Sequence, residues 1–276
     1  TRLLLAWTLA SGAAADTPTA PLDGDAVMAL SRDRDEGDSF ASKVDLVLVD
    51  RQGRERVREF VFLQLADAAG KRASLFFTAP QDVRGVAFHI VNPREASGGE
   101  DAQWMYLPVS RQTRRISTTD KRGAFMGSTY SYADLDGVRV GDWDNQLIGE
   151  EVIDGRPAWV VERRPARPEV QARTGYERVV AWVDQGNHLL LRQDYFDSRG
   201  VMFKQNRTLE VETVDGIDSI MLSETVNLEN GSRARMHFRQ LRYNVAPDPR
   251  LFGEAALARG LRGGDLPLLD EWNAAR

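Results

Sequence analysis

KVDLVLVDRQGRERVREFVFLQL, residues 43–65, alternates apolar and polar side chains around one sharp turn. Val44, Leu46 and Leu48 fall on one face of an extended chain, and Lys43 and Asp45 fall on the other. A period of two residues is typical of a β-strand with one buried face. The turn DRQG, which ends at Gly53, returns the chain into a second apolar run. The segment therefore predicts a β-hairpin.

The same alternation continues along most of the chain. It predicts further strands over residues 71–77, 86–91, 103–107, 147–153, 156–163, 178–183, 189–196, 201–211, 219–228 and 233–243. Short turn signals such as DQGN, DSRG, VDG and ENGS stand between them. Many sequential strands joined by short turns favour an antiparallel meander, and a sheet of that length curls. The predicted fold is mainly β: a single strongly curved antiparallel sheet or partial barrel.

Few segments depart from this pattern. Asp23 or Asp25 caps one predicted amphipathic helix, and an acidic stretch over residues 33–38 follows it. That stretch lacks the alternating ligands and closing glutamate of a calcium loop, which favours solvated surface over a metal site. Two longer segments, residues 106–135 and 163–175, show no clean strand period, and loops of that length are usually functional or mobile. The tail after residue 247 reads as a weakly ordered appendage, with a helix as one of the forms it could take.

Composition narrows the classes of function. The 276 residues carry a formal charge of -5 with a pI near 5.4, which argues against a nucleic-acid-binding protein. The beginning, TRLLLAWTLASGAAADTP, has a basic residue, a short apolar run and small residues before Asp16. This order predicts a cleavable signal peptide over residues 1–15. The chain has no cysteine, so neither a disulfide nor a lipid-anchoring thiol is expected. We expect an exported, periplasmic protein.

Catalytic motifs are absent from the sequence. His89, His188 and His237 stand alone, without a partner at metal-binding spacing. There is no Gly-x-Ser-x-Gly elbow, and the segment GAFMGS lacks the lysine of a phosphate loop. The acidic pieces DLDG and DWD are more simply read as turn formers than as ligands for an ion or a glycan. We expect no enzymatic activity, no metal and no cofactor.

What remains is a surplus of bulky apolar side chains on the predicted strands. The candidate inward-facing residues are Phe60, Phe62, Phe77, Phe88, Trp104 and Tyr106. A curved sheet that turns such residues inward either fills its own interior or leaves a cavity for an apolar ligand. Both outcomes are compatible with the sequence, and a shift of one residue in register would move any of these side chains to the opposite face.

Four segments carry a resemblance to a known family. They are DAQWMYLPVSRQTRRI, KRGAFMGSTYSYADL, TAPQDVRGVAF and VDQGNHLLLRQDYFDSRG. Together they make the chain resemble the outer membrane lipoprotein-sorting proteins, relatives of LolA and LolB, over residues 25–252. The resemblance implies a LolA-like half-barrel domain over residues 16–252, with helices covering its mouth, followed by a C-terminal extension over residues 253–276. LolA-type members carry the acyl chains of lipoproteins on the concave face of the half-barrel.

The segment of residues 106–135 gains a role from this resemblance. Phe125 and Met126, which lie between Gly123 and Gly127, would form a pliable apolar plug over the concave face. The basic residues would meet an anionic headgroup or the acidic surface of a partner protein. These basic residues are Arg111, Arg114, Arg115, Lys121 and Arg122. The alternative is a solvated loop with one buried anchor at Phe125.

Two hypotheses for function follow. The first is a non-enzymatic periplasmic carrier of lipoprotein acyl chains or other lipid-like amphiphiles between the inner and outer membranes. It acts as a monomer that makes transient contact with a membrane surface. The second is a periplasmic accessory module of an inner-membrane RND/MMPL-type exporter, with a filled interior and no transported ligand of its own. An esterase or a sugar-binding enzyme is disfavoured because no acid, base and nucleophile set is present.

Overall fold

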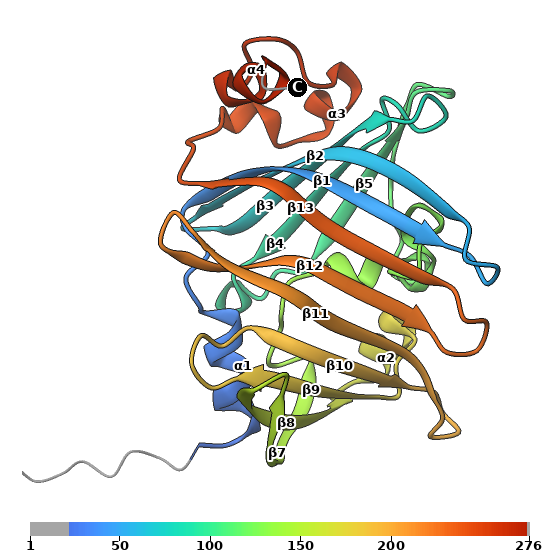
Figure 1. Cartoon of the computed structure of the whole chain (residues 1–276), viewed down its shortest axis with the longest axis vertical. Helices are drawn as coiled ribbons and strands as arrows, with labels where there is room; N and C mark the ends of the chain where they lie inside the picture. Colours follow the sequence, from blue (N-terminus) through green and yellow to red (C-terminus); the bar gives the residue numbers. More distant parts are fainter. Residues whose placement is uncertain (1–21, 275–276) are drawn as a thin grey trace, which may run out of the picture.

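Thirteen antiparallel strands form one continuous sheet across residues 22–274, the part of the chain that this computed structural model describes (Figure 1). The sheet is strongly curved and does not close into a barrel, which confirms the predicted fold class. The predicted signal peptide, residues 1–15, lies outside the described residues.

The strands follow the alternating segments of the sequence. They are β1 (Ser39–Val49), β2 (Glu55–Asp67), β3 (Gly70–Ala79), β4 (Ala87–Pro93), β5 (Ala102–Leu107), β6 (Gln112–Arg115), β7 (Trp143–Ile153), β8 (Arg156–Pro165), β9 (Arg178–Asp184), β10 (Leu190–Phe196), β11 (Met202–Val214), β12 (Ile217–Asn227) and β13 (Arg233–Tyr243). Their order in the sheet is β6-β5-β4-β3-β2-β1-β13-β12-β11-β10-β9-β8-β7. Strands that are neighbours in the chain are neighbours in the sheet, except β6 and β7. The first and last strands, β1 and β13, also pair. This pairing leaves β6 and β7 as the two edges.

One segment crosses from edge to edge over the concave face. It comprises residues 116–142 and is called the strap below. Its only local order is three 3₁₀ turns and one isolated bridge, Ala124 to Ser131. The turns are η2 (Asp120–Arg122), η3 (Phe125–Gly127) and η4 (Tyr132–Leu135). The strap contains residues 116–135 of the long segment that the sequence singles out and continues to residue 142.

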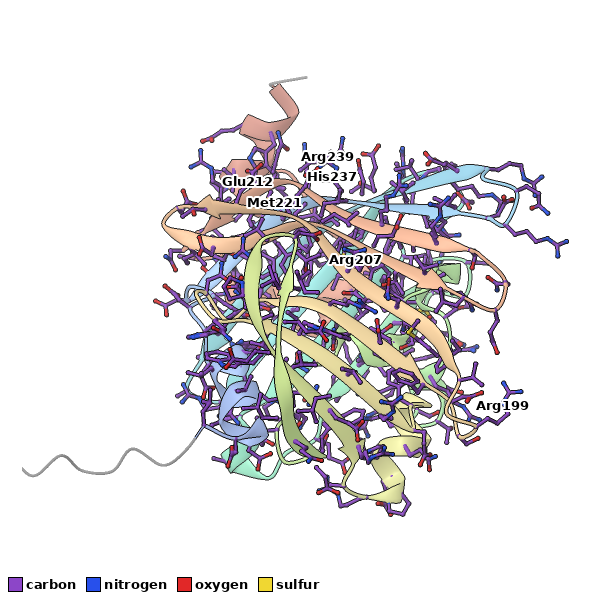
Figure 2. The ribbon with its side chains drawn as sticks, turned by 60° about the horizontal axis from the view of Figure 1, so that its bottom comes forward. Arg199, Arg207, Glu212, Met221, His237 and Arg239 are labelled. Carbon is purple, nitrogen blue, oxygen red and sulfur yellow. The ribbon has the colours of Figure 1, made fainter. Side chains whose placement is uncertain are left out.

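Residue alternation decides which side chains face inward. Val44 on β1 lies opposite Phe60 on β2, and both are buried on the concave face. On β13 Met236 joins the same cluster, whereas His237 and Arg239 belong to the outer side, where Arg239 pairs with Asp45 (2.8 Å; Figure 2). On β13 the period of two thus separates an apolar inner face from a largely polar outer face.

The helix α1 (Gly24–Arg32) covers the concave face at its β7–β9 end (Figure 1). Asp23 caps it, since its carboxylate accepts a hydrogen bond from the backbone N–H of Ala26 at 2.8 Å. Val27 and Met28 are fully buried against β8 and β9. Within residues 22–274, no helix has both the length and the apolar character needed to cross a bilayer.

The outer face of β1–β5 is apolar too, and the end of the chain covers it. The covering segments are η5 (Pro249–Leu251), α3 (Glu254–Arg259) and α4 (Pro267–Ala274), at the top of Figure 1. Leu251, Leu257 and Trp272 pack with Leu63 and Phe76 of the sheet, a contact region called the outer cluster below. The helical tail is therefore part of the protein's core.

Three short elements escaped the sequence pattern. Strand β6 is only four residues long and polar, so it carries no apolar alternation. Helix α2 (Pro168–Thr174) lies in the predicted loop of residues 163–175, with Pro168 in its first turn and Gly175 left-handed (φ 76°) at its end. The turn η1 (Glu95–Ser97) joins β4 to β5.

Candidate functional site

Aromatic rings from neighbouring strands form an apolar floor on the concave face. Phe60 lies opposite Phe77, with ring centroids 5.0 Å apart, and Phe77 lies 6.0 Å from Phe88. All three expose 2% or less of their surface. The floor, as the term is used below, consists of Val44, Leu46, Phe60, Leu75, Phe77, Phe88 and Ile90. Phe62 is half-buried beside it, 6.2 Å from Phe60.

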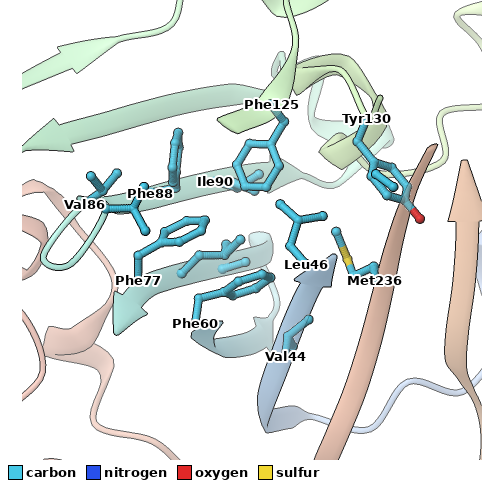
Figure 3. Close-up of a cluster of buried hydrophobic side chains, with 14 residues drawn as sticks. Val44, Leu46, Phe60, Phe77, Val86, Phe88, Ile90, Phe125, Tyr130 and Met236 are labelled. Atoms are coloured by element: carbon cyan, nitrogen blue, oxygen red, sulfur yellow. The ribbon is translucent and has the colours of Figure 1, made fainter. Parts of the chain in front are cut away.

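Phe125 of the strap inserts into this floor from above (Figure 3). Its ring centroid lies 5.0 Å from that of Phe88, 6.1 Å from Phe77 and 5.7 Å from Tyr132. Phe125 is 0% exposed, and Met126 packs against the same cluster. The structure thus brings together Phe60, Phe62, Phe77, Phe88, Phe125 and Met126 on the concave face, and the floor is filled by the protein's own side chains.

A tight turn directs Phe125 toward the floor. Met126 and Gly127 both adopt positive φ angles, 50° and 71°. The hydroxyl of Ser128 donates to the carbonyl of Phe125 at 2.7 Å, and the Arg58 guanidinium of β2 donates to the carbonyl of Met126. Left-handed backbone is unfavourable for a residue with a Cβ, so Met126 is held there by its surroundings. The glycines of this segment serve the turn, as the sequence suggests.

A buried ion pair fastens the strap to the second half of the sheet. The ammonium of Lys204 on β11 contacts the carboxylate of Asp134, and both side chains are less than 10% exposed. The Tyr176 hydroxyl donates to Asp134 at 2.6 Å and accepts from Lys204 at 2.8 Å. Burial, reinforced by the charge of Asp134, raises the pKa of Tyr176 well above its ordinary value, so this hydroxyl stays protonated.

Further ion pairs hold the strap at the β5 side. Arg139 pairs with Asp101 at 3.1 Å. Lys121 pairs with Asp136 within the strap at 2.9 Å and donates to the backbone carbonyl of Asp101 at 2.8 Å. Burial raises the pKa of Asp101 to about 6, and the neighbouring charge of Asp136 adds to the rise, while Arg139 opposes it. Charges buried in this way are costly unless each finds a partner, so the pairs define one position for the strap.

The aromatic patch of the strap adds two residues to the site that the sequence pattern had not singled out. Tyr130 is buried and its hydroxyl bonds to Ser223 on β12 at 2.9 Å. Burial raises its pKa to about 12. Tyr132 packs on Phe88 at 5.9 Å. Their clustering with Phe125 along the chain was the available signal.

Trp104 and Tyr106 do not belong to the concave face, which corrects the prediction. Both pack into the outer cluster, and Trp104 stacks on His89 at 5.7 Å. Met105 and Leu107 face the floor instead. The prediction was wrong by one residue of register, because both faces of β5 are apolar and alternation alone does not say which is inside.

The predicted basic group divides in two. Lys121 is 2% exposed and is taken up by Asp136, so it is not available to a headgroup or partner as predicted. Arg111, Arg114, Arg115 and Arg122 are exposed, three of them on or beside edge strand β6. Among the described residues these four arginines form no ion pair with a carboxylate, and Arg115 lies 5.9 Å from the Trp104 ring centroid. A run of charges does not reveal which member the fold buries.

Comparison with known proteins places this arrangement in a family. A family model described as that of an uncharacterized protein matches residues 69–259, which is more than half of the chain. A solved DUF1329 family protein from Desulfovibrio piger shares 27% identity over 85% of this chain and 97% of its own, with a TM-score of 0.78.

The chain belongs to the DUF1329 family.

Two further solved structures share the DUF1329 architecture. An outer membrane lipoprotein-sorting protein domain from Vibrio parahaemolyticus has 24% identity over 86% of this chain and 98% of its own, with a TM-score of 0.78. A LolA superfamily protein from Nitrosomonas europaea has 18% identity over 85% of this chain and 99% of its own, with a TM-score of 0.64. These likenesses confirm the predicted LolA/LolB-like fold. None of the curated proteins compared matches the chain.

The DUF1329 match covers most of the site. It begins at the start of β3 and ends with the last residue of α3, so it includes the strap, the β3 and β4 side of the floor, and Lys204. The first hairpin, which supplies Val44 and Phe60, precedes it.

Proposed function

We propose that this protein carries a lipid-like amphiphile, whose acyl chain lies on the apolar floor in the position that Phe125 takes here. The observation that carries the proposal is the burial of Phe125. An aromatic side chain from a segment whose local order is limited to short 3₁₀ turns and one bridge is packed into the floor of the concave face. Phe125 then occupies the place of the acyl chain in the unliganded protein, and binding replaces the Phe125 ring on the floor with the acyl chain.

The energetics favour such an exchange. Burying a CH₂ group contributes about 0.8 kcal/mol, and fully burying a phenylalanine side chain contributes roughly 1.5–3 kcal/mol. A chain of ten or more carbons therefore has more apolar surface to bury than the ring it displaces. No covalent step is needed, and binding stays reversible because the ring can return.

The solved relatives support the proposal at the level of the fold. One is a lipoprotein-sorting domain of the outer membrane system and another is a LolA superfamily protein. We extend this to a non-enzymatic carrier of lipoprotein acyl chains or similar lipids, located in the periplasm. The carrier would be a monomer that touches a membrane surface when it loads and unloads.

The test is to remove the Phe125 side chain. Phe125→Ala should bind a fluorescent fatty acid more tightly than the wild type, by about tenfold, because the floor no longer has to be vacated. Phe88→Asp should weaken binding, since it puts a charge on the floor. The matched control is Phe76→Ala, a buried phenylalanine of the outer cluster that should leave probe affinity unchanged.

Absence of probe binding by both the wild type and Phe125→Ala, together with organic extracts of the native protein that contain no lipid by mass spectrometry, would overturn the carrier proposal.

A second function is favoured by a separate observation. The floor is filled, and three exposed arginines, Arg111, Arg114 and Arg115, lie on or beside edge strand β6 without an ion pair to a carboxylate of the described residues. This combination fits an accessory module that docks on an acidic surface of an RND/MMPL-type exporter. Arg114→Glu with Arg115→Glu should then abolish binding to the purified exporter and leave fatty-acid binding as it was. Equal exporter binding by the wild type and the double variant would exclude this role.

A further inference from the structure

A polar cavity of about 1010 Å³ opens beside the apolar floor. It lies between the segment that follows α1, the turn joining β2 to β3, the β4–η1 region and the strap. Leu135 of the strap lines this cavity and also packs on the floor cluster. The apolar floor and the polar cavity are therefore adjoining parts of one concave surface.

The inward row of each strand turns polar where it reaches this cavity. On β4, Phe88 and Ile90 belong to the floor, and Asn92, next on the same face, lines the cavity. On β2, Gln64 continues the row of Phe60 and Phe62. Asp101, just before β5, adds a carboxylate beside Asn92.

Three polar atoms of this row lack a hydrogen-bond partner among the described residues. They are Oδ2 of Asp101, Nδ2 of Asn92 and Nε2 of Gln64. The side chain of Asp101 is 1% exposed, and its other oxygen is engaged by Arg139. Asn92 lies near enough to oppose the rise in the pKa of Asp101, but the two groups do not reach good hydrogen-bond geometry. Leaving such groups unpaired costs about 1–3 kcal/mol each, so the row is arranged for a polar guest.

The charges around the cavity restrict that guest. Its lining has three more carboxylates than basic side chains. Four of the five basic side chains pair with carboxylates, as Arg32 does with Glu95 at 2.7 Å and Lys71 with Glu36 at 2.5 Å. The fifth, Arg94, is exposed and donates to the backbone carbonyl of Asp67 at 3.5 Å. An anionic group would therefore meet an excess of carboxylates, with Arg94 at the surface as the one basic side chain of the lining that has no carboxylate partner among the described residues. An ammonium group would suit Asp101 but would leave the amide N–H groups of Asn92 and Gln64 without an acceptor.

We propose that this cavity binds an uncharged, hydroxyl-bearing headgroup, such as a sugar or glycol, of the amphiphile whose chain lies on the floor. A hydroxyl donates to Oδ2 of Asp101 and accepts from Nδ2 of Asn92 or Nε2 of Gln64, so it satisfies both kinds of unpaired atom. The inference rests on the proposed carrier function and adds the class of headgroup to it.

The experiment uses three amphiphiles with the same ten-carbon chain: decyl maltoside, decanoate and decyltrimethylammonium. Their affinities for the full chain are measured by calorimetry below the micelle concentration. Decyl maltoside should bind at least tenfold more tightly than either charged probe. Asn92→Ala should remove that preference by weakening the maltoside alone. Asn230→Ala, in the exposed turn after β12, is the matched control and should change nothing.

The outcomes separate the two proposals. Equal binding of all three probes, a preference for a charged probe, or a maltoside affinity that Asn92→Ala leaves unchanged would overturn the headgroup assignment while the carrier role stands. Failure of every probe to bind either the wild type or Phe125→Ala would overturn the carrier role, and the headgroup assignment with it.

Discussion

Single buried side chains set the position of the strap, and for two of them the structure predicts a measurable effect on the free energy of unfolding. Phe125 is an apolar anchor without exposure, whereas Asp101 is a carboxyl held where its charge is poorly solvated. Burial of Phe125 stabilises the folded protein at any pH. Burial of the Asp101 charge destabilises it by an amount that depends on pH.

Phe125→Ala should lower the free energy of unfolding by about 3–5 kcal/mol, the range typical of a buried phenylalanine. Met126→Ala should cost less, because Met126 is only partly buried. Urea unfolding at neutral pH measures both. A loss below 1 kcal/mol for Phe125→Ala, on the scale of ordinary surface substitutions, would mean that the ring is not held in the floor in solution.

Asp101 should make the protein more stable as the pH falls toward 5. Its pKa in the folded protein is about 6, above the ordinary value of 3.8, so the folded state binds the proton more tightly than the unfolded state. The cost of its charge is complete above about pH 7 and is relieved as the pH falls from about 7 to about 4. Between pH 7.5 and 5 the wild type should gain roughly 1–2 kcal/mol relative to Asp101→Asn, since one pKa unit corresponds to about 1.4 kcal/mol.

Parallel urea titrations of the wild type and Asp101→Asn at pH 5 and pH 7.5 give this difference directly. Identical pH dependence in the two proteins would contradict the raised pKa.

The strap depends on its ion pairs more than on any backbone ladder. Lys204→Met should leave the buried Asp134 carboxylate without its cation, and breaking a buried pair in this way costs about 3–5 kcal/mol. Hydrogen exchange measured by mass spectrometry should rise first in residues 124–135. Arg199→Met, which removes an exposed pair with Asp197 at the tip of the β10–β11 hairpin, is the control (Figure 2).

Exchange in residues 124–135 that is the same for Lys204→Met, Arg199→Met and the wild type would show that the strap is held by packing alone.

Strands were predictable from sequence wherever one face is apolar and the other polar. The β1–β2 hairpin, with Val44 opposite Phe60, is the clearest case. Prediction failed where that contrast is missing. Trp104 was assigned to the wrong face because β5 is apolar on both sides, and β6 was missed because it is polar on both. Lys121 was assigned to the surface because its partner, Asp136, becomes its neighbour only in the folded strap.

The polar cavity lay beyond prediction for a related reason. Gln64, Asn92 and Asp101 are ordinary polar residues at strand ends, far apart along the chain. Only the pairing of β2, β3 and β4, and the turn of the chain into β5, aligns them at one mouth of the sheet. The hydrophobic pattern predicts the floor, whereas the register of several strands together decides what lies at its end.

Across the entire chain, stability rests on both faces of the sheet. The outer cluster buries Leu251, Leu257, Leu266 and Trp272 against strands whose inner side is already occupied by the floor. A chain ended after residue 247 should lose roughly 1.5–3 kcal/mol for each large apolar side chain no longer buried. Its unfolding temperature should fall, and a dye specific for exposed apolar surface should bind.

Fatty-acid affinity of the truncated chain should stay close to that of the full chain, because the floor lies on the other side of the sheet. An unchanged unfolding temperature would instead show that residues 253–276 form a separable appendage. Calorimetry on the two chains distinguishes these outcomes.

The strap joins the last residue of β6 to the first residue of β7, and these strands are the two edges of the sheet. It therefore connects the two edges of the curved sheet across its concave side. If β6 and β7 moved apart, the strap would be stretched and Phe125 would be withdrawn from the floor. If they moved closer together, Phe125 could return. A surface that flattens the sheet would thus withdraw the Phe125 ring from the floor, and a guest that displaces the ring would favour the flatter sheet. Ligand binding on the floor and the curvature of the sheet would then be coupled through the strap.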